Sequence, residues 1–119
     1  MKQVIVMRND LNMRKGKMIA QGAHASIMFL QDALHFGRGL TEEEQQWVNT
    51  GYKKVCVRAD SIQELLKIHL QAKEAGLKSF LILDEGHTEF GGVATHSCLA
   101  IGPHSEEKID KITGSLKLL

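Results

Sequence analysis

Four short apolar runs, separated by segments long enough to form helices, constrain the fold of this chain most strongly. The runs lie at residues 4–7, 54–58, 79–83 and 97–101, and Gly102 with Pro103 is expected to end the last one. Helical patterns are expected at about 16–37, 41–49, 61–75 and 105–113. Helix-length crossovers between strands are typical of α/β proteins. We therefore predict one domain over residues 1–119, a mixed four-stranded β-sheet with helices on both faces.

The longest helical pattern, at about 16–37, combines an apolar face, a small-residue side and a polar stripe. The apolar face carries Ile19, Ala23, Ile27, Leu30 and Leu34. Gly22, Ala25 and Ser26 keep another part of the surface thin enough for close packing. Lys17, Gln21 and His24 follow one another at helical spacing and form the polar stripe. The polar stripe is the part that could hold a substrate.

The composition is that of a globular protein without a membrane segment. The chain has 119 residues with a formal net charge of +1, and 43% of the residues are hydrophobic. No apolar run reaches the length of a signal peptide or a membrane span, so we expect a cytoplasmic protein with no membrane partner. Cys56 and Cys98 lie in strand-like surroundings and are expected to be buried reduced thiols. Thr41 and the glutamates at 42–44 are expected to form a solvated, capped helix start.

A cationic loop precedes the longest helix and is the best candidate for a binding site. Arg14, Lys15 and Lys17 flank a helix N-terminus, which attracts anions. Cations oppose the helix dipole at this end, so helix stability does not explain their presence. If the first and third strands are parallel, their ends also bring Arg8 near Asp84 and the helix start. We therefore predict that residues distant in sequence converge at an anion-binding site.

Blocks of residues along nearly the whole chain are similar, in the same order, to one protein family. They are Arg8-Asn9-Asp10-Leu11-Asn12-Met13, Lys15-Gly16-Lys17, Ala20-Gln21-Gly22-Ala23-His24-Ala25, Gln46-Trp47, Lys54-Val55, Asp84-Glu85-Gly86-His87-Thr88, Ala100-Ile101-Gly102-Pro103 and residues 110–118. This pattern resembles that of the type-two peptidyl-tRNA hydrolases typical of archaea and eukaryotes. There are three departures: Arg14 replaces a glycine, His87 replaces an arginine, and residues 89–95 replace a segment that usually contains Gln and a Pro-Gly pair.

The resemblance implies an enzyme that cleaves the ester between a peptide and the 3′-terminal ribose of tRNA, with no metal or other cofactor. The family's functional residues fall on Lys17, His24, Asp84, Thr88 and Ser97, the last of which stands where the family usually has threonine. Lys15 and Gln21 belong to the same motif. Arg8, Arg14 and Lys15 are expected to bind phosphates of the peptidyl-tRNA substrate, which would position its acceptor end without reading sequence.

The resemblance leaves the role of each residue open. Lys17 could stabilise the oxyanion or bind a phosphate, and Asp84 could take a proton from water or orient a neighbour. The hydroxyl of Thr88 or Ser97 could hold water or substrate. His24 could carry a proton, brace the site or be a core histidine. Two other functions are a non-catalytic RNA-binding relative and a protein-interaction module on the same fold. The oligomeric state is also open, with a homodimer as one alternative.

Overall fold

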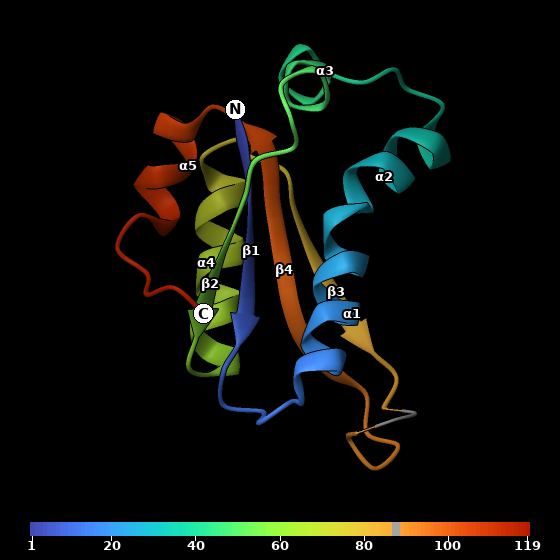
Figure 1. Ribbon diagram of the computed structural model, residues 1–119, viewed down its shortest axis with the longest axis vertical. Helices are drawn as coiled ribbons and strands as arrows, with labels where there is room; N and C mark the ends of the chain where they lie inside the picture. Colours follow the sequence, from blue (N-terminus) through green and yellow to red (C-terminus); the bar gives the residue numbers. More distant parts are fainter. Residues whose placement is uncertain (87–88) are drawn as a thin grey trace.

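The computed structural model describes residues 1–86 and 89–119, and these contain a four-stranded sheet with strand order β2-β1-β4-β3 (Figure 1). β1 (Lys2–Arg8) pairs in parallel with β2 (Lys54–Ala59) and antiparallel with β4 (Thr95–His104). β4 also pairs antiparallel with β3 (Ser79–Asp84). β1, β2 and β3 therefore point the same way. This confirms that the carboxyl ends of the first and third strands share one edge of a mixed sheet.

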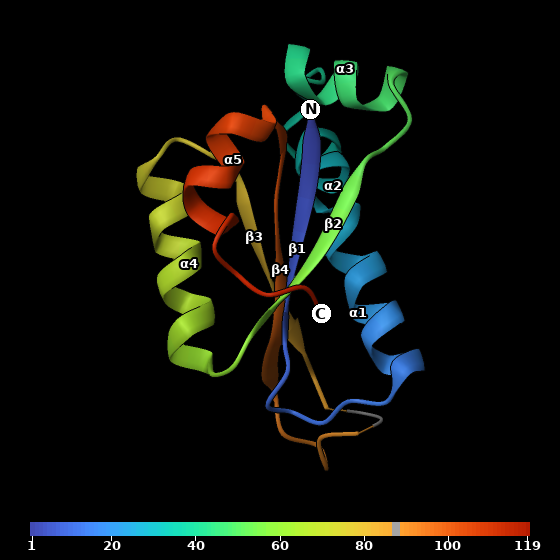
Figure 2. The same ribbon diagram turned by 60° about the vertical axis from the view of Figure 1, so that its left-hand side comes forward.

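Helices cover both faces of the sheet, as predicted (Figure 1, Figure 2). α1 (Lys15–Ser26) and α2 (Met28–Phe36) lie on one face, and α4 (Ile62–Glu74) and α5 (Glu106–Thr113) lie on the other. α3 (Glu42–Asn49) lies beyond the end of the sheet. Within the part of the chain that the structure describes, no helix is long and apolar enough to cross a membrane.

β1 is buried on both faces because its alternate residues enter two different cores. Val4 and Val6 join a cluster with residues of α4 and α5. Ile5 and Met7 point to the opposite face and join a cluster with residues of α1 and β4. Successive side chains of a strand alternate in this way, so a central strand covered on both sides reads as a continuous apolar run. The run at residues 4–7 therefore predicted the centre of the fold correctly.

Residues 16–37 form two helices rather than the single long helix that we predicted. Ile27 ends α1 and begins α2, with φ −90° and ψ −1°. After the break, the ring of Phe29 packs edge to face on Trp47 of α3, with ring centroids 5.6 Å apart. This tertiary contact buries Phe29, which does not belong to the apolar face predicted from the helical pattern of the sequence.

The small-residue side of α1, and not its apolar face, lies against the sheet. Gly22 and Ala25 are buried, and a Cβ added at Gly22 would lie 3.8 Å from side-chain atoms of Ile5 and Met7. Because the helix backbone approaches the strands this closely, the larger side chains point outward. The exposed fractions are 72% for Ile19, 57% for Ile27, 44% for Leu30 and 76% for Leu34. We call Ile19, Ala23, Ile27, Leu30 and Leu34 the apolar ridge.

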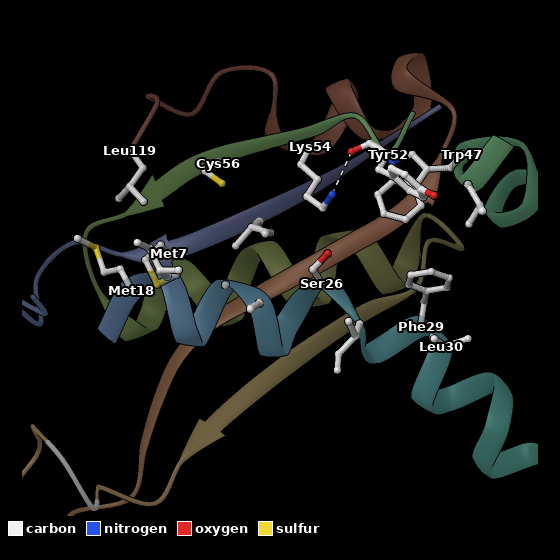
Figure 3. Close-up of a pocket in the computed structure, with 16 residues that line it drawn as sticks. Met7, Met18, Ser26, Phe29, Leu30, Trp47, Tyr52, Lys54, Cys56 and Leu119 are labelled. Atoms are coloured by element: carbon white, nitrogen blue, oxygen red, sulfur yellow. Dashed lines mark hydrogen bonds between the residues drawn. The ribbon is translucent and has the colours of Figure 1, made fainter. Parts of the chain in front are cut away.

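Ile19, Ala23, Ile27 and Leu30 of the apolar ridge line one wall of a groove of about 670 Å³ beside β2 (Figure 3). Ile5 and Met7 line the groove between α1 and β2, and the Trp47 and Leu119 side chains lie toward its two ends. Because α1 leaves this face of β2 uncovered, Cys56 is exposed in the groove, and the expectation that it is buried was wrong. Cys98 is buried as expected, and both thiols are free.

α3 begins at a buried ion pair rather than at a fully solvated acidic patch. Thr41 caps the helix as predicted, accepting a hydrogen bond from the backbone N–H of Glu44. Glu44 is only 1% exposed, and Arg38 donates to its two carboxylate oxygens over 2.7 and 3.1 Å. Burial acts to raise the pKa of Glu44, but the hydrogen bonds from Arg38 and Thr41 outweigh it and lower the pKa.

β4 continues through Gly102 and Pro103 to His104, although these two residues were expected to end it. Gly102 has φ +87°, and a Cβ at this position would lie 2.8 Å from the backbone nitrogen of His104. Glycine adopts this conformation without a steric cost, so the strand bends and continues. The helix that follows begins at Ser105, as predicted, with the backbone N–H of Lys108 donating to the Ser105 hydroxyl.

Candidate active site

The first turn of α1 and the end of β3 bring Lys17 and Asp84 together. Lys17 Nζ donates to Asp84 Oδ1 over 2.9 Å, and the two side chains are 11% and 13% exposed. α1 carries no acidic residue in its first turn, so the positive charge of Lys17 opposes the helix dipole without local compensation. Asp84 supplies the compensating charge from a distant strand. This mostly buried ammonium and carboxylate are the centre of the candidate site.

Gln21, one turn further along α1, connects Asp84 to Ser97. Its Nε2 donates to Asp84 Oδ1 over 3.3 Å, and its Oε1 accepts a hydrogen bond from the Ser97 hydroxyl. Gln21 is 2% exposed and Ser97 is 0% exposed. Buried polar groups need partners, and these two side chains satisfy one another. Lys17 and Gln21 of the polar stripe therefore face the strand ends.

A bulge in β4 turns Ser97 toward α1. The pairing of β3 with β4 passes from Ile82 opposite Cys98 to Leu83 opposite His96, so Ser97 is the extra residue. As a result Ser97 and Cys98 both reach Gln21, since the Cys98 thiol donates to the backbone carbonyl of Gln21 over 3.4 Å. The hydroxyl of Ser97 holds Gln21 and is fully buried. This hydroxyl therefore does not face solvent, as direct contact with water or substrate, one of the roles left open, would require.

The loop after β3 holds the second oxygen of the Asp84 carboxylate. The backbone N–H of Gly86 donates to Asp84 Oδ2 over 3.0 Å, and the N–H of Gly92 donates to the carbonyl of Gly86 over 2.8 Å. Gly86 has φ +85°, and a Cβ there would lie 2.6 Å from the backbone nitrogen and oxygen of Val93. Only glycine fits this close crossing, which closes the loop and fixes the carboxylate.

Arg14 and Lys15 lie at the surface beside the start of α1. The side chain of Arg14 is 88% exposed, and Lys15 is also exposed. The carboxylate of Glu89, 18% exposed, accepts a hydrogen bond from the backbone N–H of Arg14 and lies 3.2 Å from its Nε. A carboxylate of the chain itself therefore lies at the helix N-terminus, where we expected an anion. Arg14 and Glu89 are both departures from the family pattern, and they pair with each other.

Arg8 is held at the end of β1 by neighbouring groups. Its Nε and Nη2 donate to the two carboxylate oxygens of Asp10 over 3.1 and 2.7 Å, and its Nη1 donates to the carbonyl of His96 over 3.1 Å. The hydrogen bond from Arg8 lowers the pKa of Asp10 below its ordinary value. Because Arg8 is only 11% exposed and already paired, it is less suited to bind a phosphate than Arg14.

His24 lies outside the hydrogen-bonded centre of the site, and Thr88 falls outside the described residues. His24 is exposed in the last turn of α1, and within residues 1–86 and 89–119 its ring makes no hydrogen bond. It is therefore not the core histidine that we considered. Thr88, like His87, lies outside the described residues. Among the residues that are described, no group of three or more His, Cys, Asp or Glu could hold a metal ion.

Sequence reasoning missed Glu89 and Phe90, which both contact α1. The Phe90 ring lies over Lys17, with 5.4 Å between the ammonium nitrogen and the ring centroid. Two signals were available: a lone aromatic residue in a glycine-bearing loop, and an acidic residue in a segment that departs from the family as Arg14 does. Neither signal reveals a contact across seventy residues of chain without the fold.

Comparison with known proteins agrees with this arrangement over the full chain. The family model described as "Peptidyl-tRNA hydrolase PTH2" matches residues 1–119. The peptidyl-tRNA hydrolases of Methanothermobacter thermautotrophicus and Methanocaldococcus jannaschii are 49% and 48% identical over 119 residues, which is 100% of each chain. A probable peptidyl-tRNA hydrolase 2 of Dictyostelium discoideum is 45% identical over 118 residues, covering 98% of this chain and 54% of that protein. The chain therefore belongs to the peptidyl-tRNA hydrolase PTH2 family.

Proposed function

We propose that the site around Lys17 and Asp84 hydrolyses peptidyl-tRNA, the activity of the family to which the chain belongs. The observation that carries this proposal is the 2.9 Å contact between a mostly buried ammonium and a mostly buried carboxylate. Hydrolysis of an ester needs positive charge at the carbonyl oxygen, which becomes negative in the transition state. Lys17 supplies this charge. The intact pair also favours catalysis over a non-catalytic RNA-binding function.

The residues around Lys17 act by holding it in place. Asp84 fixes the ammonium, and Gln21 and Gly86 fix the two oxygens of Asp84. Ser97 in turn holds Gln21 from the core of the sheet. A charge that is held in position before the reaction needs no reorganisation in the transition state, and this is the main source of its catalytic effect. Lys17 is thus the catalytic residue, and the other four are positioning residues.

The exposed cations beside the site bind the RNA part of the substrate. The side chain of Arg14 is 88% exposed although its Nε contacts Glu89, and Lys15 is exposed next to it. Contacts of this kind with phosphates orient tRNA without reading its sequence. They fit recognition of the acceptor end that all tRNAs share. We also infer a cytoplasmic location, where translation produces peptidyl-tRNA.

Single-turnover hydrolysis of an N-blocked aminoacyl-tRNA tests the site. Lys17→Met and Asp84→Asn should each lower the rate at least about a hundredfold, the scale of losing an oxyanion contact. Lys67→Met, which removes an exposed lysine on α4, is the matched control and should leave the rate unchanged. Near-normal rates in both site variants, with normal thermal unfolding, would show that the site is misplaced. The rate should also survive a metal chelator, provided that the tRNA stays folded.

We further propose that two copies of the chain associate through the apolar ridge and the groove beside it. The ridge lies on α1 and α2, and four of its five residues line the groove. A two-fold axis between two such surfaces places each ridge in the groove of the other copy, which is the self-complementarity that a symmetric dimer requires. Lys54 is the only charged side chain among the described residues that line the groove. An apolar surface with a single charged side chain fits another copy better than it fits RNA.

The size of the apolar surface agrees with a dimer interface. Each ridge isoleucine or leucine leaves between 44% and 76% of its surface exposed. Each such side chain exposes on the order of 100 Å² of apolar surface, which is about the area removed from water when one aliphatic side chain is buried. Together these four side chains supply about half of the roughly 800 Å² per partner that stable interfaces bury, and the groove residues add further apolar area. Exposed apolar patches of a few hundred Å² often mark interaction sites.

Sedimentation equilibrium of the wild type and two glutamate variants tests the dimer. Ile27→Glu places a charge on the ridge and should give monomers, whereas Leu70→Glu on α4 changes an equally exposed residue and should leave the dimer intact. The exposed fractions of the two side chains, 57% and 58%, make the pair a matched control. Alkylation of Cys56 should slow as the protein concentration rises, since the dimer covers the groove. A wild-type chain that stays monomeric at every concentration would rule out this interface.

A further inference from the structure

The loop between β3 and β4 is fastened to the start of α1 at two adjacent residues. Glu89 accepts a hydrogen bond from the backbone N–H of Arg14 over 3.2 Å, and its other carboxylate oxygen lies 3.2 Å from Arg14 Nε. Phe90, the next residue, packs against the core cluster that includes Met13. The backbone turn after it is closed by the N–H of Val93 donating to the Phe90 carbonyl. The Phe90 ring is therefore held by apolar packing, by the turn and by the anchored Glu89 next to it.

The held ring lies over the ammonium of Lys17. The distance from Lys17 Nζ to the ring centroid is 5.4 Å, within the range of about 6 Å in which a cation and an aromatic face attract each other. Lys17 has a flexible stem, and its side chain is only 11% exposed, so little water solvates its charge. Asp84 meets the ammonium from the end of β3, and Phe90 meets it from the loop. These two contacts from separate segments restrict where the ammonium can lie.

We propose that Phe90 is a positioning residue for Lys17, and that Glu89 anchors it. The inference rests on the proposed role of Lys17. The aromatic face compensates the ammonium for lost hydration without neutralising its charge, as a second carboxylate would. The charge thus remains available to a developing oxyanion while the stem is confined. Residues 89–95 replace the usual family segment, so this chain confines its lysine through its own version of the loop.

Two substitutions at Phe90 distinguish the effect of the aromatic face from the effect of apolar packing. Phe90→Leu keeps an apolar side chain in the core cluster but removes the aromatic face, whereas Phe90→Tyr keeps the face. Cation–aromatic attraction corresponds to a change of about threefold for an exposed pair and about thirtyfold for a desolvated one. In single-turnover hydrolysis of an N-blocked aminoacyl-tRNA, we expect Phe90→Leu to lower the saturating rate within that range. The Michaelis constant should stay unchanged, and Phe90→Tyr should keep the wild-type rate.

A double-mutant cycle with Lys17→Met shows whether the effect passes through the lysine. In the Lys17→Met background, Phe90→Leu should have no further effect, because the group that it positions is gone. Val93→Ala is the matched control in the same loop, since that side chain is 64% exposed, and it should leave the rate unchanged. Thermal unfolding checks that each variant folds, and Phe90→Met serves in place of Phe90→Leu if the latter does not.

The outcomes distinguish this inference from the proposed function. A normal rate for Lys17→Met would reject the catalytic role of Lys17, and the positioning role with it. An impaired Lys17→Met with a normal Phe90→Leu would reject the positioning role alone. Equal losses in Phe90→Leu and Phe90→Tyr, or a Phe90→Leu loss that persists in the Lys17→Met background, would show that the ring supports the loop and does not act on the lysine.

Discussion

Replacing Gln21 by methionine should lower both the stability of the fold and the rate of hydrolysis, for separable reasons. Gln21→Met keeps a buried unbranched side chain but removes the amide. The fully buried Ser97 hydroxyl then loses its oxygen acceptor and keeps only the Cys98 sulfur at 3.8 Å, which costs about 1–3 kcal/mol. Asp84 loses a hydrogen bond worth about 1.5 kcal/mol, the lower end for charged groups, because the distance is 3.3 Å. A total loss of about 3 kcal/mol should lower the melting temperature by roughly 10 °C.

Adding Ser97→Ala to Gln21→Met separates the two effects. With both partners removed, no buried hydroxyl lacks an acceptor, so the double variant should regain about 1 kcal/mol of unfolding free energy relative to the value expected from the two single variants. The hydrolysis rate should not recover, because Asp84 still lacks the Gln21 amide. Thermal unfolding and single-turnover hydrolysis of the wild type, the two single variants and the double variant measure both quantities.

Two results would refute this reasoning. If the stability losses of the single variants simply add in the double variant, Gln21 and Ser97 are not coupled and the bulge in β4 has another purpose. If instead the rate recovers together with the stability, Gln21 supports the fold and does not orient Asp84. A wild-type rate in Gln21→Met would have the same meaning for the proposed site.

Three further predictions concern other parts of the molecule. Arg38→Met leaves the carboxylate of Glu44 buried without its partner and should cost about 3 kcal/mol of unfolding free energy in chemical denaturation. The pKa of Glu44 is lowered in the folded chain, so this residue stabilises the fold at neutral pH. That stabilisation is lost as the pH falls below 4.5 through the folded pKa. Arg38→Met should remove this acid dependence. Arg14→Gln should raise the Michaelis constant and flatten the log–log salt dependence by about one unit, the value for one lost phosphate contact, and an unchanged slope would place Arg14 outside the RNA footprint. Alkylation of the native chain should modify Cys56 alone, since Cys98 is buried and burial raises its pKa to about 11; mass spectrometry that finds both thiols modified would contradict this.

Local signals in the sequence predicted most of the elements and the starts of several helices, and topology predicted the meeting of Lys17 with Asp84. Thr41 and Ser105 indicate helix starts because each side chain accepts a hydrogen bond from the backbone N–H three residues later. The common edge of β1 and β3 follows from the strand directions, so two residues at that edge converge without any knowledge of side-chain packing. These inferences depend on interactions that a short segment or a strand order already specifies.

The features that the sequence did not predict depend on contacts between distant segments. Ser97 reaches Gln21 only because a bulge adds one residue to β4, and no residue type marks a bulge in an apolar strand. Phe90 reaches Lys17 through a loop whose shape is set by its anchor on Arg14. Sequence spacing carries no information about either contact.

The orientation of α1 shows why hydrophobic periodicity misled here. An amphipathic helix normally buries its apolar face, and by that rule Ile19 and Ile27 belong in the core. α1 instead directs Gln21 and the mostly buried Lys17 toward the strand ends, where Asp84 pairs with both. Gly22 and Ala25 allow this orientation, because they let the helix approach the sheet without large side chains between them. The helix loses apolar burial in order to place an ammonium at a sheet edge. Local rules are expected to fail in this way at functional sites. In the proposed dimer, a second copy of the chain would bury the apolar ridge that α1 leaves at the surface.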